Sequence, residues 1–147
     1  MHKYKDFNKE FTLLPVLRVN ENLESQFLEE INKIDEDLIN YYKQLNLENP
    51  SFYELICEEL PIGYAKTFTQ IKYCILSEIY IVNNFRELGL GTFILNSIRT
   101  EVKKKNLPLR TITLPSDRVA KNFYEASGIT ARILLMEEKR DKPRYRS

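Results

Sequence analysis

The residues of this chain most suited to chemistry are two glycines, Gly89 and Gly91, that lie between a strand-like and a helix-like segment. Residues 75–82 before them indicate a strand, and residues 92–99 after them indicate a helix. Glycine allows a backbone to approach a ligand closely and to adopt angles that a side chain would forbid. The unpaired N–H groups and the dipole of a helix start attract an anion. Residues 88–92 are therefore predicted to form a phosphate-binding turn, which we call the cradle.

Two common phosphate-binding motifs are excluded at the cradle. A dinucleotide fingerprint requires a third glycine where Ile94 stands and an acidic residue about 20 residues later. A nucleoside-triphosphate loop requires Lys-Ser/Thr directly after its last glycine, and here Thr92 and Phe93 follow. The Gly-x-Gly pair alone is also compatible with a simple tight turn before a helix, so it does not identify the ligand.

A wider pattern around the glycines resembles a known signature. Arg86-x-x-Gly89-x-Gly91, after a strand, resembles the acetyl-CoA signature of the GNAT superfamily of N-acetyltransferases. A second signature of that family is matched downstream by Asp117-x-x-Ala120-x-x-Phe123-Tyr124-Glu125-x-x-Gly128-Ile129. The resemblance covers about residues 60–129, and it departs from the family where Asp117 replaces Asn and Ile129 replaces Phe.

The resemblance implies acetyl-CoA as co-substrate and no metal. The CoA pyrophosphate would lie on the N–H groups of the cradle with Arg86 beside it, and the strand edge at Ile81 and Val82 would pair with the pantetheine arm. Those two side chains are also expected in the core. A carboxylate at Asp117 lacks the amide donor of Asn, so that residue is left with two roles, a cofactor contact or only a helix cap. The implied cofactor-binding residues are Ile81, Val82, Arg86, Glu87, Leu88, Gly89, Leu90, Gly91, Thr92, Asp117 and Ala120.

Tyr124 is the candidate general acid. Transfer of an acetyl group from a thioester to an amine expels a thiolate, which a nearby phenol can protonate. Many members of the family carry a tyrosine at this place in the signature. The alternative is that Tyr124, one of nine tyrosines, only packs beside Phe123.

Glu78 is the candidate base that removes a proton from the amine. It alternates with Ile79 and Ile81 along the predicted strand, so its side chain should face away from theirs. The alternatives are an ordinary polar partner on a half-exposed strand, or a proton relay through water.

Composition limits the other chemistries. At 147 residues and 43% hydrophobic content the chain is long enough for one domain with a single core. The only histidine is His2, at an end that we expect to be mobile, which excludes histidine-based triads and ordinary zinc sites. Cys57 and Cys74 lie in apolar runs and are predicted to be buried thiols, with a bridge between neighbouring strands as the alternative.

The order of predicted elements matches the GNAT order. We predict a single α/β domain over residues 1–138, with a mixed, mostly antiparallel sheet of about six strands flanked by three to four helices, and a basic tail over 139–147. The predicted strands cover residues 11–19 (interrupted at Pro15), 52–58, 64–69, 75–82, 110–114 and 133–136. The predicted helices cover 23–45 (as one or two, capped by Asn20 or Asn22), about 91–104, and from Ser116 or Asp117 to Gly128.

The acceptor is suggested only by charge. In GNAT proteins the helices between the first two strands wall the acceptor site, and an acidic wall would attract a cationic amine. A solvated helix face is the competing interpretation. Against two lysines, residues 21–59 carry eleven acidic residues, Glu21, Glu24, Glu29, Glu30, Asp35, Glu36, Asp37, Glu48, Glu54, Glu58 and Glu59.

The ends of the chain leave further hypotheses open. The tail 139–147 and the lysines 103–105 could contact RNA or the 3′-phosphate of CoA, although a solubilising tail is favoured and nucleic acid binding is not. After Gly128 there is room for one strand where the family has two, so either the sheet is shorter or a second chain completes it in a homodimer. No run of about 18 apolar residues and no signal peptide is present, so we expect a cytoplasmic protein without a membrane partner.

The leading hypothesis is an acetyl-CoA-dependent N-acetyltransferase that acts on a primary amine of a small molecule or peptide by direct transfer in a ternary complex. The alternative is a non-catalytic CoA-binding or protein-interaction module on the same fold. A small nucleotide-binding domain is the third and least favoured hypothesis.

Overall fold

The computed structural model describes residues 1–36, 40, 47–113 and 117–138. Its helices are α1 (Glu21–Ile34), α3 (Leu90–Lys104) and α4 (Arg118–Ala126), with a 3₁₀ turn η1 (Asn83–Phe85) before α3. Its strands are β1 (His2–Asp6), β2 (Lys9–Val16), β3 (Pro50–Cys57), β4 (Leu60–Thr69), β5 (Cys74–Ile81) and β6 (Leu109–Thr111).

The six strands form one curled sheet in the order β1-β2-β3-β4-β5-β6. Strands β1 to β5 pair antiparallel with their neighbours, and β6 alone runs parallel to β5. A parallel neighbour requires a crossover, and α3 supplies it. The predicted α/β class and the mixed, mostly antiparallel sheet are confirmed.

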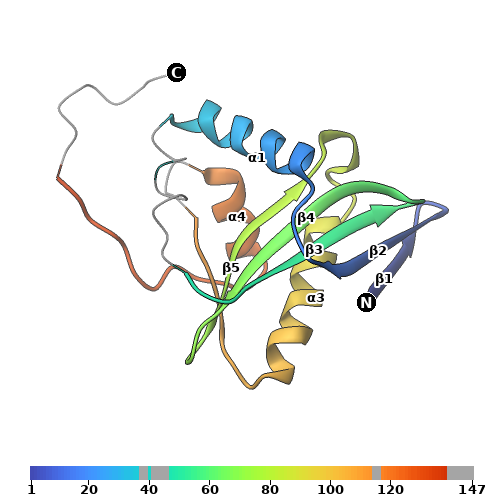
Figure 1. Ribbon diagram of the computed structural model, residues 1–147. Helices are drawn as coiled ribbons and strands as arrows, with labels where there is room; N and C mark the ends of the chain where they lie inside the picture. Colours follow the sequence, from blue (N-terminus) through green and yellow to red (C-terminus); the bar gives the residue numbers. More distant parts are fainter. Residues whose placement is uncertain (37–39, 41–46, 114–116, 139–147) are drawn as a thin grey trace.

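Helices α1 and α3 lie on opposite faces of the sheet (Figure 1). The main core joins α3 to one face, through residues such as Leu76, Ile94 and Ile98. A smaller cluster joins α1 to the other face. Its members are Leu23, Phe27, Ile31, Tyr64 and Tyr80.

Helix α1 forms because its apolar residues recur on one face and its first turn is capped. Leu23, Phe27 and Ile31 are each spaced by four residues and buried, which contributes about 1.5–3 kcal/mol per side chain. The side chain of Asn20 accepts hydrogen bonds from the N–H groups of Asn22 and Leu23. Of the two predicted caps, Asn20 is therefore the one that begins α1, two residues before the predicted start of the helix. Residues 37–39 and 41–46 of the predicted helix lie outside the described residues.

The N-terminal strand β1 was not predicted. Phe7 and Asn8, with φ of 54° and 59°, turn the chain back so that β1 pairs with β2 in a hairpin. The predicted interruption at Pro15 is wrong, because Pro15 pairs with Tyr53 inside β2. The first residue of β1, His2, lies opposite Leu13, so β1 does not extend as far as Pro15. The missing N–H of Pro15 therefore removes no hydrogen bond between β1 and β2.

The predicted strand at residues 133–136 is also wrong. These residues form no strand, and their side chains are exposed. The sheet still has six strands because β1, which was not predicted, pairs with β2 at the edge opposite β6. Cys57 and Cys74 are buried free thiols, as expected. Within the described ranges, no helix is long and apolar enough to span a bilayer.

Candidate active site

The cradle is the first turn of α3. Gly89 is the N-cap residue with φ +78°, a left-handed backbone that favours glycine, and no side chain caps the helix. The N–H groups of Leu90, Gly91 and Thr92 therefore lack an intrahelical acceptor, as at every helix start. Helix α3 begins at Leu90, one residue before the predicted start, and this arrangement favours an anion at its N-terminal end.

Gly91 connects the two sequence signatures in space. A Cβ at Gly91 would lie 3.3 Å from Cε1 of Phe123, closer than most side chains tolerate. Phe123 of α4 therefore packs directly on the first turn of α3. The absence of a side chain at Gly91 therefore allows α4 to pack closely on α3.

The edge of β5 opens beyond its first three residues. Strand β6 pairs with β5 only from Cys74 to Leu76. At that point the β4–β5 register shifts, so that Lys66 is opposite Glu78 while Thr67 is opposite Leu76. Ser77 is the extra residue of this bulge, and such a bulge bends the strand. The remaining residues of β5 have no strand partner on the β6 side in the described structure.

The main-chain groups at the end of β5 are already bonded within the chain. Val82 donates its N–H to the Ile62 carbonyl at 2.9 Å and accepts from the Phe85 N–H at 3.0 Å. The Ile81 carbonyl accepts from Nε of Arg86 at 2.7 Å. An extended ligand at this edge would have to pair further up β5 or replace Arg86 at the Ile81 carbonyl.

Arg86 is held between β5 and α1. Besides its bond to Ile81, its guanidinium donates to Oε2 of Glu30 at 2.7 Å and lies 5.4 Å from the centre of the Tyr80 ring. The bond to Glu30 raises the pKa of Arg86, which stays charged. Arg86 thus lies between β5 and the cradle in the sequence, but its charge is paired with Glu30 of α1.

The α4 residues of the second signature divide between capping and core packing. Oδ1 of Asp117 accepts a hydrogen bond from the N–H of Ala120 at 3.2 Å, so Asp117 caps α4. A helix cap was one of the two roles expected of this residue. Burial raises the pKa of Asp117, and the Glu30 charge raises it further. Tyr124 is only 6% exposed, belongs to the main core, and its ring lies 5.3 Å from that of Phe123.

Glu78 lies on the opposite face, under α1, as its alternation predicted. It is 6% exposed, and its carboxylate lies 2.9 Å from Nζ of Lys66. The same ammonium lies 3.1 Å from Glu24 of α1. We call Glu24, Lys66 and Glu78 the Lys66 network. Burial raises the pKa of Glu78 despite the Lys66 charge and a hydrogen bond from Tyr64, while the two carboxylates raise the pKa of Lys66 against its own burial.

Comparison with known proteins identifies the fold. No protein-family model and no curated protein sequence matches the chain. Among solved structures, the aminoglycoside N-acetyltransferase AAC(6′)-Iy in complex with CoA is 11% identical, with a TM-score of 0.61 over 91% of this chain and 97% of that one. A mutant of the BH1408 protein from Bacillus halodurans is 16% identical, with a TM-score of 0.71 over 87% and 98%. The chain has the GNAT fold.

A third structure matches to a similar degree. The aminoglycoside acetyltransferase meta-AAC0020 from an uncultured soil metagenomic sample, in complex with trehalose, is 13% identical with a TM-score of 0.60. The match covers 90% of this chain and 97% of that one. The GNAT fold is thus retained at identities where side chains have diverged widely.

A second group of polar side chains, between β5 and α1, was not predicted from the sequence. The Tyr80 hydroxyl lies 3.0 Å from both Gln26 and Glu30 of α1. Burial and the bond to Glu30 raise the pKa of Tyr80 to about 12. Like the Lys66 network, this group joins residues more than 40 positions apart. Alternation places Glu78 and Tyr80 on one face of β5, but their partners on β4 and α1 could not be deduced from it.

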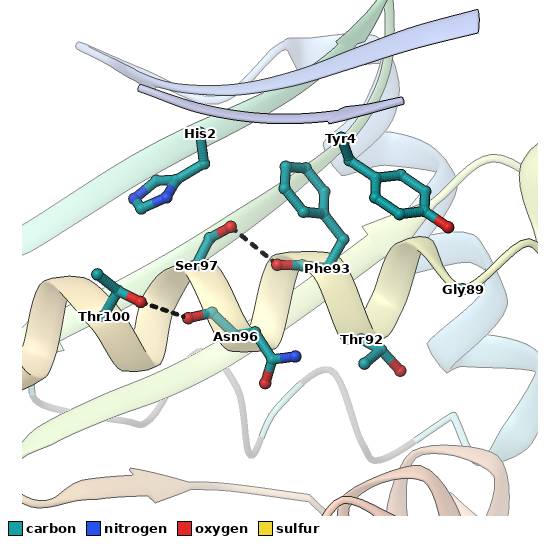
Figure 2. A pocket seen from close by; sticks show the side chains of 8 residues that line it. All are labelled: His2, Tyr4, Gly89, Thr92, Phe93, Asn96, Ser97 and Thr100. Carbon is teal, nitrogen blue, oxygen red and sulfur yellow. Dashed lines mark hydrogen bonds between the residues drawn. The ribbon is translucent and has the colours of Figure 1, made fainter. Parts of the chain in front are cut away.

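A pocket of about 510 Å³ adjoins the cradle on its β1 side. In Figure 2, His2 and Tyr4 of β1 point toward α3, whereas Thr92 and Asn96 of α3 point away from β1. The rings of Tyr4 and Phe93 are stacked, with centroids 5.4 Å apart. His2 is anchored in β1 and bonded to Glu101 at 2.8 Å, so the expectation of a mobile His2 is wrong. The pocket is lined by His2, Tyr4, Gly89, Thr92, Phe93, Asn96, Ser97 and Thr100.

The acidic residues of α1 fall into two groups. Glu24 and Glu30 are bonded to Lys66 and Arg86. Glu21 and Glu29 are exposed, as on a solvated helix face. Over the described ranges, no cluster of three or more metal-ligating side chains occurs. The basic tail 139–147 lies outside the described residues.

Proposed function

We propose that the protein is an acetyl-CoA-dependent N-acetyltransferase that transfers an acetyl group to a primary amine by direct transfer in a ternary complex. The observation that carries the proposal is the uncapped first turn of α3, beside the open edge of β5, within a GNAT fold. An anion-binding helix start and an unpaired strand edge are the two features that a pyrophosphate joined to an amide-rich arm requires.

The donor would bind through main-chain groups. In this proposal the N–H groups from Leu88 to Thr92 bind the pyrophosphate, and the pantetheine arm pairs along β5. Arg86 then leaves the Ile81 carbonyl, or the arm pairs above it. The bonds that Val82 already makes exclude new pairing at its own N–H. Ala120 and Asp117 would border the cofactor from α4, which packs on the cradle through Phe123.

The chemistry would use both faces of β5. The amine nitrogen attacks the thioester carbon, the carbon–sulfur bond breaks, and the sulfur leaves as a thiolate. Tyr124, on the α3 face, is the proposed donor of a proton to that sulfur. Glu78, on the α1 face, is the proposed acceptor of the proton that the amine loses, directly or through water. Its raised pKa suits a base better than an ordinary carboxylate would.

The acceptor is proposed to be a cationic amine that approaches from α1. Two of the similar structures are aminoglycoside acetyltransferases, whose substrates carry several amines. The exposed carboxylates of α1 would raise the local concentration of such a cation. The same charges are expected on the solvated face of any helix, so the class of acceptor is to be identified by assaying a panel of amines.

Calorimetric titration with acetyl-CoA, followed by measurement of free thiol over a panel of amines, tests the proposal. The expected result is saturable binding of acetyl-CoA and thiol release that requires one class of amine. Aminoglycosides, polyamines and lysine peptides form the cationic arms, and an uncharged sugar without an amine forms the control. Absence of acetyl-CoA binding would overturn the proposal.

A non-catalytic CoA-binding module is the second candidate. It is favoured by the internal pairing of Lys66 with Glu78 and by the burial of Tyr124 in the core. This candidate predicts acetyl-CoA binding without thiol release on any amine. The two measurements together therefore separate it from an enzyme.

A further inference from the structure

Glu30 of α1 binds the arginine that lies next to the cradle in the sequence. Its Oε2 atom accepts a hydrogen bond from the Arg86 guanidinium at 2.7 Å and another from the Tyr80 hydroxyl at 3.0 Å. Burial raises the pKa of Glu30, but the hydrogen bonds from Arg86 and Tyr80 outweigh burial and lower that pKa below its ordinary value. Glu30 is therefore charged at neutral pH and forms an ion pair with Arg86.

The sheet holds the same arginine from the other side. Nε of Arg86 donates to the Ile81 carbonyl at 2.7 Å, and the guanidinium carbon lies 5.4 Å from the centre of the Tyr80 ring. Tyr80 packs with the buried residues of α1, and its hydroxyl also donates to Gln26 of that helix at 3.0 Å. These contacts fix the guanidinium on the face of β5 that α1 covers.

Both groups that Arg86 binds matter to an anionic donor. The Ile81 carbonyl is at the end of β5, where an amide-rich arm would pair. A guanidinium binds phosphate strongly, but here it already donates to a carboxylate. Burial raises the pKa of Asp117 and the Glu30 charge raises it further, so this charge also acts at the N-cap of α4. Glu30 therefore opposes a pyrophosphate both by binding Arg86 and by its own charge.

We propose that Glu30 is a positioning residue that lowers the affinity for acetyl-CoA by holding Arg86 on α1. The inference rests on the proposed function. Arg86 is the C-cap residue of η1, in the turn that leads to Gly89, and its side chain is 37% exposed, so it can turn towards the cradle without leaving the core. When the pyrophosphate binds, Arg86 exchanges the Glu30 carboxylate for a phosphate oxygen. The Ile81 carbonyl then becomes available to the pantetheine arm, and α1 loses one of its ion pairs with the rest of the protein.

Calorimetric titration with acetyl-CoA tests the inference. Glu30→Gln removes the charge but keeps the size of the side chain, and it should lower the acetyl-CoA dissociation constant roughly fivefold, the equivalent of one partly exposed ion pair. Glu29→Gln makes the same change of charge at an exposed neighbour on α1 and should alter the constant less than about twofold. Equal dissociation constants in the wild type and Glu30→Gln would overturn this inference and leave the proposed function standing. Absence of acetyl-CoA binding in every protein would overturn both.

A double-mutant cycle tests whether Glu30 acts through Arg86. Arg86→Gln should weaken acetyl-CoA binding, and adding Glu30→Gln to it should gain no more affinity than Glu29→Gln does, because no arginine is left to release. A full fivefold gain without Arg86 would mean that Glu30 acts by repulsion alone, which contradicts the positioning role. Thermal unfolding adds a readout of opposite sign, because loss of the ion pair should lower the melting temperature of Glu30→Gln by about 2 °C while its affinity rises. A merely structural role of Glu30 would lower both.

Discussion

The cradle and the Lys66 network differ in how the sequence builds them. The cradle is five consecutive residues, and its polar groups are main-chain N–H groups fixed by the start of α3. The Lys66 network draws single side chains from α1, β4 and β5 and buries two charges between them. Side-chain changes should therefore affect the cradle through backbone geometry, and the network through uncompensated charge.

The largest expected effect is on the network. Lys66→Met leaves the Glu78 carboxylate buried without its cation and should lower the free energy of unfolding by about 3 kcal/mol at neutral pH. Urea titration monitored by circular dichroism measures the change. The double variant Lys66→Met/Glu78→Leu removes both charges and should regain most of the stability. A double variant as unstable as the single one would show that lost packing, and not charge, is responsible.

The same variant has a predictable pH dependence. Without Lys66, the folded pKa of Glu78 rises further above its unfolded value, because burial already raises it. Stability is then full below the unfolded pKa and is lost as pH rises through the folded pKa. Lys66→Met should therefore unfold more easily at pH 8 than at pH 4.5, relative to the double variant. Equal differences at the two pH values would contradict this assignment.

Next in size is the proposed acid on α4. Tyr124→Phe keeps the ring that packs in the core but removes the hydroxyl, so turnover should fall about 100-fold while acetyl-CoA binding changes little. Steady-state thiol release and calorimetry give the two numbers. Tyr53→Phe on β3 is a control for loss of one hydroxyl elsewhere. Unchanged turnover in Tyr124→Phe would remove the acid role and leave only packing.

At the cradle the expected effect is smaller and separates its two glycines. Gly89→Ala forces a side chain into a left-handed backbone at a cost of about 1–2 kcal/mol and should weaken acetyl-CoA binding roughly tenfold. Gly91→Ala meets the Phe123 ring at 3.3 Å and should mainly lower the melting temperature. Calorimetry and thermal unfolding of both variants test the division. A reversed pattern would show that Gly91 faces the ligand.

The contrast between the two regions also explains what the sequence could predict. The cradle, the start of α1 and the cap at Asp117 depend on neighbouring residues, so local patterns predicted them. The partners of Lys66 and Arg86 depend on the β4–β5 bulge and on the position of α1, which no local pattern contains. Strand β1 was missed because its alternating lysines resemble a polar terminus, and residues 133–136 were misassigned because strand propensity does not supply a partner.

The smallest effect concerns Asp117, the residue that departs from the family signature. Its carboxylate accepts the Ala120 N–H, and an asparagine oxygen can accept the same bond. Asp117→Asn should therefore change the free energy of unfolding by at most a few tenths of a kcal/mol, whereas Asp117→Ala should lower it by about 1 kcal/mol. If Asp117 only caps α4, Asp117→Asn should alter the acetyl-CoA dissociation constant less than about threefold. A larger gain in affinity would mean that the carboxylate faces the cofactor, because removing its charge then removes a repulsion that the helix start must otherwise overcome.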